Sequence, residues 1–143
     1  MISSPLTPSP APETMLPAII SYAIYLLAAA MMLGVFFFIY TRLTPFDEVA
    51  LIHARNGAAA VSLGGALIGF SLTIASGIIH NTSFIAFVLW SVGAMIVQVV
   101  VYAIASRLLH TMRPEIEAGN VAMGGFMGTI SLVAGVINAA CLS

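Results

Sequence analysis

The chain alternates four long apolar runs with short polar segments. An α-helix rises about 1.5 Å per residue, so each run is long enough to cross the roughly 30 Å apolar core of a bilayer. The pattern therefore predicts an all-α membrane protein with transmembrane helices over about 16–41, 56–79, 83–106 and 120–141. Residues 1–15 are rich in proline and serine and are predicted to be a disordered tail before a membrane domain over 16–143.

The polar segments predict how the helices are connected. Residues 80–82 form so short a connection that the second and third helices should be antiparallel neighbours. After the first run, Thr44 followed by Pro45 predicts a short surface helix that ends near Arg55, with Thr44 as its N-cap. Tyr40, near the end of the first run, is expected at the headgroup level, where a tyrosine hydroxyl reaches water.

Small residues mark one face of two predicted helices. In the last run Gly124, Gly128, Ser131, Gly135 and Asn138 recur at steps of four, three, four and three, which places them on one helical face. Small residues let helix backbones approach closely within a membrane. We therefore predict helix-packing roles, and a homo-oligomer formed through these faces, for Gly65, Gly69, Gly124, Gly128 and Gly135.

An internal repeat is visible at an offset of 64 residues. The matching positions are Ala54, Asn56, Ala58, Gly64 and Ala75 with Ala118, Asn120, Ala122, Gly128 and Ala139. Both copies run through a helix, an arginine-bearing loop and a second helix that is entered through asparagine. The repeat predicts two similar helical hairpins in the same orientation, related by an axis along the membrane normal.

Composition supports the membrane assignment and sets the expected topology. The chain is 61% hydrophobic and only 6% charged, whereas about a quarter of the residues of a soluble domain are charged. All its positive charges are arginines, and they lie in segments 42–55 and 107–117. The positive-inside rule places these segments in the cytoplasm and both termini outside. The net charge of −1 argues against a nucleic-acid-binding surface.

Candidate chemistry is sparse. His53, His80 and His110 lie in different polar segments and lack metal-ligand spacing, so they are expected to be polar interface residues. No nucleophile elbow, phosphate-binding loop or zinc signature is present in the sequence. We therefore expect no enzymatic activity, no metal site and no cofactor.

The polar residues at the helix starts and within the runs allow two interpretations. Asn56 and Asn120 suit N-caps, which is the favoured interpretation, or a shared entrance between the repeats. Gln98 and Asn138 need internal partners, since an unsatisfied amide in hydrocarbon costs several kcal/mol. Hydrogen bonds between helices are favoured for them over a pore lining. Glu115 and Glu117 are expected to cap a helix start and to lie solvated at the headgroup level, with cation binding at a cytoplasmic mouth as the alternative. The same holds for Asp47 and Glu48, for which pairing with Arg42 or Arg55 is a further alternative.

Together these residues resemble a bacterial inner-membrane family known as domain of unknown function 350 (YjfL-like proteins). The resemblance spans about residues 16–142 and rests on Leu43–Glu48, on Asn56 with the glycines that follow it, on Ile116–Asn120 and on Asn138–Cys141. It implies an integral inner-membrane protein built from duplicated two-helix units. The sequence departs from the family pattern at Arg55-Asn56, where Gly-Asn is expected, as at Gly119-Asn120.

Two functions follow as hypotheses. The first is a small oligomeric channel or transport component with a polar route through Asn56, Gln98, Glu117, Asn120 and Asn138. The alternative is a structural or partner-binding membrane protein, active in envelope maintenance or stress. In that case, segments 42–55 and 107–117 would dock a cytoplasmic protein.

Overall fold

Long membrane-spanning helices and short connecting helices make up the protein, whose computed structural model describes residues 12–81 and 83–142, with side chains from residue 15. The helices are α1 (Pro12–Leu43), α2 (Glu48–His53), α3 (Gly57–His80), α4 (Phe84–Leu108), α5 (Met112–Glu117) and α6 (Val121–Cys141). Four of them, α1, α3, α4 and α6, are long and apolar enough to cross a membrane. No strand occurs in the described ranges.

The helix bounds differ from the predicted spans mainly at α1. Most of the predicted tail lies outside the described residues, but its last residues, from Pro12, already belong to α1. Proline is well suited to a first helical position because its missing N–H has no intrahelical partner there. At the other end α1 continues to Leu43.

The predicted cap of the first surface helix is wrong. Asp47, not Thr44, is the N-cap of α2, and its Oδ1 accepts a hydrogen bond from the Ala50 N–H at 2.9 Å. Thr44 instead closes α1, where its N–H donates to the Tyr40 carbonyl at 3.0 Å. Pro45 ends α1, since the residue before a proline avoids the helical region. Helix α2 begins only after Asp47, whose side chain supplies the cap.

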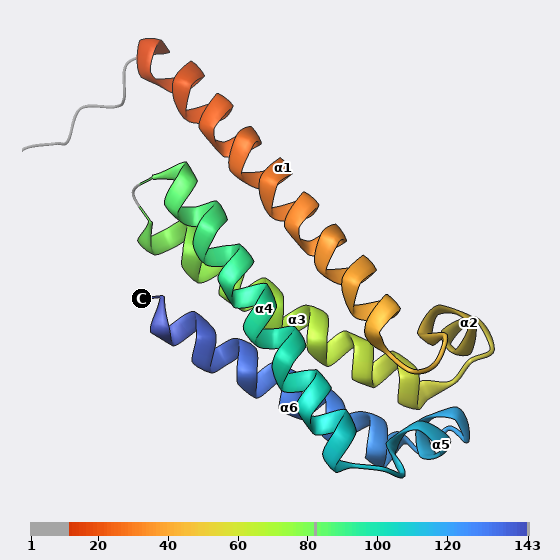
Figure 1. The fold of residues 1–143 in the computed structure, drawn as a ribbon. Helices are drawn as coiled ribbons and strands as arrows, with labels where there is room; N and C mark the ends of the chain where they lie inside the picture. The colour runs from red at the N-terminus through yellow and green to blue at the C-terminus, as the bar shows by residue number, and fades with distance from the viewer. Residues whose placement is uncertain (1–11, 82, 143) are drawn as a thin grey trace, which may run out of the picture.

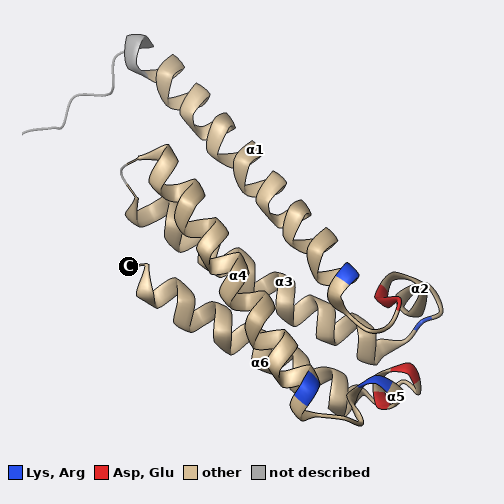
Figure 2. Ribbon diagram, viewed as in Figure 1, with Lys and Arg blue, Asp and Glu red and all other residues tan. Residues whose placement is uncertain are grey.

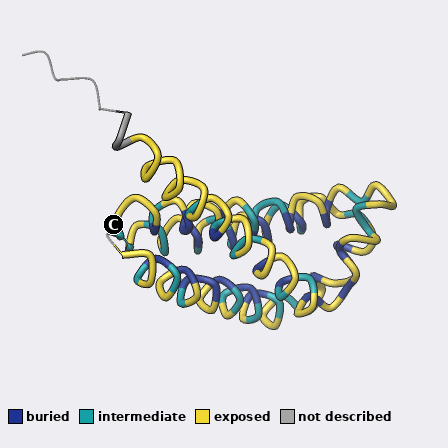
Figure 3. Tube along the Cα trace, turned by 90° about the horizontal axis from the view of Figure 1, so that it is seen from above, coloured by how far each residue is buried: buried dark blue, intermediate teal, exposed yellow. Residues whose placement is uncertain are grey.

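Helices α3 and α6 run parallel to each other and form the closest pair, while α4 lies against both of them (Figure 1). Helix α1 contacts α3 and α4 and diverges from the bundle towards its N-terminus, where its surface is exposed in Figure 3. In the most apolar stretch of α1, only 11% of the residues are buried inside the chain. Helix α1 therefore presents most of its apolar surface to the bilayer.

The glycines of α3 and α6 face each other at the contact between the two helices. A Cβ atom added to Gly65 would meet the backbone of Gly128, and one added to Gly135 would meet the backbone of Gly69. The small-residue faces predicted to pack helices therefore do so within one chain. Gly65 and Gly128 also line an open groove between α3 and α6, and the predicted homo-oligomer stays a prediction.

The turns that lead into α3 and α6 have the same backbone geometry. The N–H groups of residues 54, 55 and 56 bond to the carbonyls of 50, 52 and 51, and those of 118, 119 and 120 bond to 114, 116 and 115. Both turns pass through the left-handed region, with φ of 63° at Arg55 and 83° at Gly119. Arg55, which stands where the family pattern has glycine, thus adopts a backbone conformation that favours glycine.

Replacing Arg55 with glycine is expected to stabilise the protein slightly, by about 0.5 kcal/mol, because left-handed strain of about 1–2 kcal/mol is removed and part of the gain is lost to backbone entropy. Gly119→Ala should have the opposite effect, a loss of about 1 kcal/mol. Thermal unfolding in detergent micelles, followed by circular dichroism, measures both. A destabilising Arg55→Gly would show that the arginine side chain makes a contact worth more than the strain.

Candidate functional site

Charge is concentrated at one end of the bundle. Arg42, Arg55, Arg107 and Arg113 lie around α2 and α5, together with the acidic residues of segments 47–48 and 115–117 (Figure 2). We call this the arginine end. The arrangement agrees with the sequence pattern, because the connections between α1 and α3 and between α4 and α6 meet at the same end of a four-span chain.

Glu48 is buried at the arginine end, with no solvent exposure. Asp47 caps α2 from the exposed side, and the next residue, Glu48, points into the bundle. Neither carboxyl oxygen of Glu48 has a hydrogen-bond partner among the described residues. Burial raises the pKa of this carboxyl from its ordinary 4.5 to about 8. The sequence interpretation of Glu48 as a solvated surface acid is therefore wrong.

Two tyrosines lie beside Glu48. Tyr40 of α1 and Tyr102 of α4 are 1% and 3% exposed, and their ring centroids are 4.6 Å apart. The Glu48 carboxyl interacts electrostatically with both phenols. Neither hydroxyl has a hydrogen-bond partner among the described residues. Tyr40 is thus an interior residue and not the headgroup anchor that its position in the sequence predicts.

Serines from the central helix pair complete the surroundings of Tyr40. Ser62 of α3 and Ser131 of α6 are fully buried and lie close enough to interact with the Tyr40 hydroxyl. Their own hydroxyls have no hydrogen-bond partner within the described part of the chain. Five helices, α1, α2, α3, α4 and α6, therefore contribute hydroxyl or carboxyl groups to one region.

Gln98 extends this region along α4. Its Nε2 donates to the carbonyls of Ser131 at 2.9 Å and Ala66 at 3.3 Å, which joins α4 to both central helices. Its Oε1 has no partner in the described ranges. We define the polar cluster by six residues: Tyr40, Glu48, Ser62, Gln98, Tyr102 and Ser131.

Polar side chains continue beyond the polar cluster towards the other end of the bundle. Thr73 donates to the Gly135 carbonyl at 3.0 Å and Ser76 donates to the Ala139 carbonyl at 2.7 Å, so both tie α3 to α6. Asn138 donates to the Ala94 carbonyl at 3.1 Å. From Ser62 to Thr73 these positions span about 16 Å along α3. Polar groups therefore recur at successive depths through the bundle.

Asn56 and Asn120 are the N-caps of α3 and α6, as the favoured interpretation predicts. The Asn56 Nδ2 also donates to the Ile116 carbonyl at 2.7 Å, so it fixes α5 against the start of α3. The Asn120 Nδ2 donates to the Glu115 carboxylate at 2.6 Å. Their second predicted role, a shared entrance, stays a prediction.

The remaining predicted route residues lie in different places. Glu117 forms a surface ion pair with Arg113 at 2.9 Å, so the structure brings it neither to Gln98 nor to Asn138. Gln98 belongs to the polar cluster, and Asn138 bonds to the middle of α4. In both residues the side-chain amide nitrogen donates a hydrogen bond to another helix, as the favoured interpretation predicts. No cluster of histidine, cysteine or carboxylate side chains suited to a metal occurs among the described residues.

An open polar cleft lies at the arginine end, next to Glu48. It has a volume of about 490 Å³ and is lined by Thr41, Arg42, Thr44, Pro45, Phe46, Asp47, Val49, Arg113 and Glu117. Residues on both sides of Glu48 in the sequence line it. The cleft therefore borders the segment that carries Glu48.

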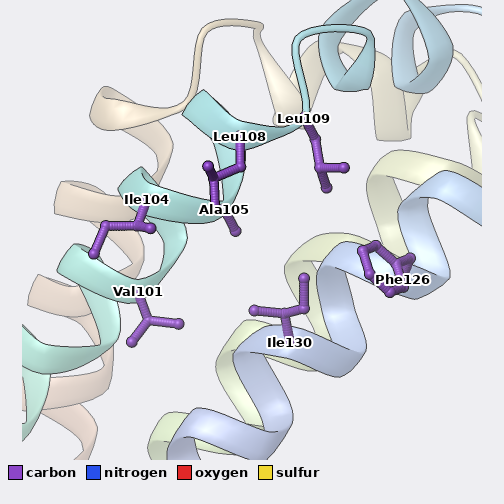
Figure 4. A pocket seen from close by; sticks show the side chains of 7 residues that line it. All are labelled: Val101, Ile104, Ala105, Leu108, Leu109, Phe126 and Ile130. Atoms are coloured by element: carbon purple, nitrogen blue, oxygen red, sulfur yellow. The ribbon is translucent and has the colours of Figure 1, made fainter.

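An apolar groove lies between α4 and α6, near positions that correspond to three residues of the polar cluster. Side chains of α4 and α6 face each other across a space of about 390 Å³ (Figure 4). At the offset of 64 residues, Tyr40, Glu48 and Ser62 correspond to Ile104, Met112 and Phe126. Of these, Ile104 and Phe126 line the groove and Met112 is buried. These three polar residues of the cluster therefore have apolar counterparts in the other half of the chain.

Comparison with known proteins identifies the family. The family described as Domain of Unknown Function (DUF350) matches residues 14–142. The UPF0719 inner membrane proteins YjfL of Escherichia coli strains K12 and O157:H7 are each 31% identical over 128 residues, which covers 90% of this chain and 97% of theirs. No solved structure matches significantly. The chain is thus a membrane protein that belongs to the DUF350 family.

Proposed function

We propose that this chain is a transport component of the inner membrane that binds a small cation at the polar cluster. The observation that carries the proposal is a buried carboxyl group, Glu48, whose unpaired oxygens lie near the unpaired hydroxyls of Tyr40 and Tyr102. The unpaired hydroxyls of Ser62 and Ser131 lie next to Tyr40. A buried polar atom without a partner costs about 1–3 kcal/mol. An ionisable side chain within a membrane bundle therefore suggests a functional role.

The cluster changes the route expected from the sequence. Gln98 remains part of the proposed route, and Asn138 lies at a deeper level. Asn56 and Asn120 instead cap helices, and Glu117 forms a surface ion pair. The cation-binding oxygens are instead provided by Glu48 and the two tyrosines. The closely packed α3–α6 contact does not block this route, because the cluster lies on the side of the pair that faces α1 and α4.

We place the arginine end in the cytoplasm, because all the arginines gather there and the positive-inside rule applies to such short loops. We regard the chain as two duplicated hairpins in parallel orientation. The matching turns at Arg55 and Gly119 and the matching caps at Asn56 and Asn120 support the duplication.

The test uses purified protein in liposomes that carry an imposed proton, Na⁺ or K⁺ gradient. Wild-type protein should dissipate one of these gradients, and Glu48→Gln should reduce the rate at least tenfold while its circular dichroism and elution profile stay unchanged. Asp47→Asn is the matched control, because asparagine is also a good N-cap and the side chain is exposed. No flux above that of empty liposomes, or equal flux in Glu48→Gln, would reject the transport proposal.

A structural or partner-binding role is the second candidate, and one observation favours it. Segments 42–55 and 107–117 are brought together around the polar cleft, where exposed charges from both are available to a cytoplasmic protein. Pull-down with variants in which either segment is replaced tests this role. Equal recovery of bound proteins when both segments are replaced would count against it.

A further inference from the structure

Glu48 has no counter-ion in the described part of the chain. The one salt bridge there joins Arg113 to Glu117, and Arg42 lies over the Phe38 ring, 4.8 Å from its centroid. The titratable groups of the packed helices that feel the charge of Glu48 are Tyr40 of α1 and Tyr102 of α4. Both are neutral acids in their usual form, and the neighbouring charge on the same segment, Asp47, is negative.

A carboxyl group in this setting is expected to be uncharged. Ionised, it would be a buried negative charge with no cation and no hydrogen-bond donor in contact with it, which is unfavourable in a medium of low dielectric constant. Protonation removes the charge and with it the largest part of this cost, because a neutral buried carboxyl group without a hydrogen-bond partner is far less unfavourable than an ionised one.

A proton fits this oxygen set better than a metal ion does. Divalent hard cations such as Ca²⁺ and Mg²⁺ take about six or more oxygen ligands, usually with several carboxylates among them. The polar cluster holds a single carboxylate, and the described residues contain no group of three metal-binding side chains. The donors are otherwise neutral hydroxyls and one amide oxygen.

We infer that Glu48 is a proton-binding site that is occupied in the arrangement seen, and that it exchanges its proton with solvent through the polar cleft beside Thr44, Asp47 and Arg113. The step is the simple addition of one proton to a carboxylate. This inference rests on the proposed transport function, for which it names the cation. Because Met112 occupies the corresponding position in the second half, each chain carries one such site.

The experiment is an infrared titration of the purified protein in lipid nanodiscs between pH 5 and pH 9. Wild type should show the C=O band of a protonated carboxylic acid that disappears around pH 8, and Glu48→Gln should lack this band. Glu115→Gln is the control that should retain it, because Glu115 lies outside the polar cluster and the cleft. Labelling wild-type protein with ¹³C-glutamate should shift the band, which assigns it to a glutamate even if Glu48→Gln fails to fold. Titration of every glutamate near pH 4.5 would overturn the inference.

The first titration uses a bulky organic cation as the only salt cation, and a second titration replaces it with Na⁺ or K⁺. A band that disappears at lower pH when either metal ion is present would overturn the choice of the proton as the cation. The outcome is also independent of transport. If the C=O band disappears near pH 8 but the protein gives no flux in liposomes, the proton site stands and the transport function is rejected.

Discussion

Alanine at Gly124 will separate the central helix pair, whereas alanine at the neighbouring Gly125 will leave it intact. A Cβ atom on Gly124 would meet the backbone of Ala58 on α3, and a backbone has no side-chain rotamer by which to move away. A Cβ on Gly125 meets nothing within 4 Å. We expect Gly124→Ala to lose about 3 kcal/mol or more of unfolding free energy, at the upper end of the usual cost of overpacking. Unfolding in mixed detergent micelles measures it.

Gly65 and Gly64 provide a second matched pair on the opposite helix. Gly65→Ala places a methyl group against the Gly128 backbone and should be as costly as Gly124→Ala, while a Cβ on Gly64 has open space around it. Alanine forms helices better than glycine, so both control variants should be unchanged or slightly more stable. Equal effects at neighbouring glycines would show that α3 and α6 are not in close contact in the folded protein.

The packing faces were predictable from the sequence, but their partner was not. Steps of four and three residues place Gly124, Gly128 and Gly135 on one face by helical geometry alone. The same pattern suits contact with another chain or with another helix of this chain. Spacing along one helix says nothing about which second helix approaches it, and the match of Gly65 with Gly128 appears only in three dimensions.

The two asparagine caps were predictable because capping is a local interaction. Asn56 and Asn120 bond to N–H groups two or three residues ahead, so the type and position of the residue are sufficient. The further bond of Asn56 to Ile116 crosses 60 residues of sequence and leaves no mark in the pattern. Local chemistry was therefore recovered, and contacts between the two halves were not.

The polar cluster was missed because its residues lie in different segments and each has an ordinary alternative explanation. Glu48 follows Asp47 in a charged loop, and Tyr40 ends an apolar run, where tyrosine usually meets the headgroups. One signal was present in the sequence: the offset of 64 pairs Glu48 with Met112 and Ser62 with Phe126. Polar residues opposite apolar ones in an otherwise similar repeat indicate a position where the two halves differ in role.

The unfolding free energy of the wild-type protein should fall as the pH is raised from about 5 to about 8. Glu48 has a folded-state pKa of about 8 and an ordinary value of 4.5, so within this window the folded state binds one more proton than the unfolded state. Its contribution is fully present below about pH 4.5 and is lost as the pH rises through about 8. The expected slope is a loss of up to about 1.4 kcal/mol per pH unit.

Glu48→Gln should remove most of this slope, because the amide is similar in shape and carries no titrating proton. Above pH 8 the variant should be more stable than the wild type, since an ionised and unpaired carboxylate is then replaced by a neutral group. Asp47→Asn should retain the wild-type slope, because its exposed side chain only caps α2. Unfolding curves of the three proteins at pH 5, 6, 7 and 8 decide the matter. A slope in Glu48→Gln equal to that of the wild type would place the titrating group elsewhere in the chain.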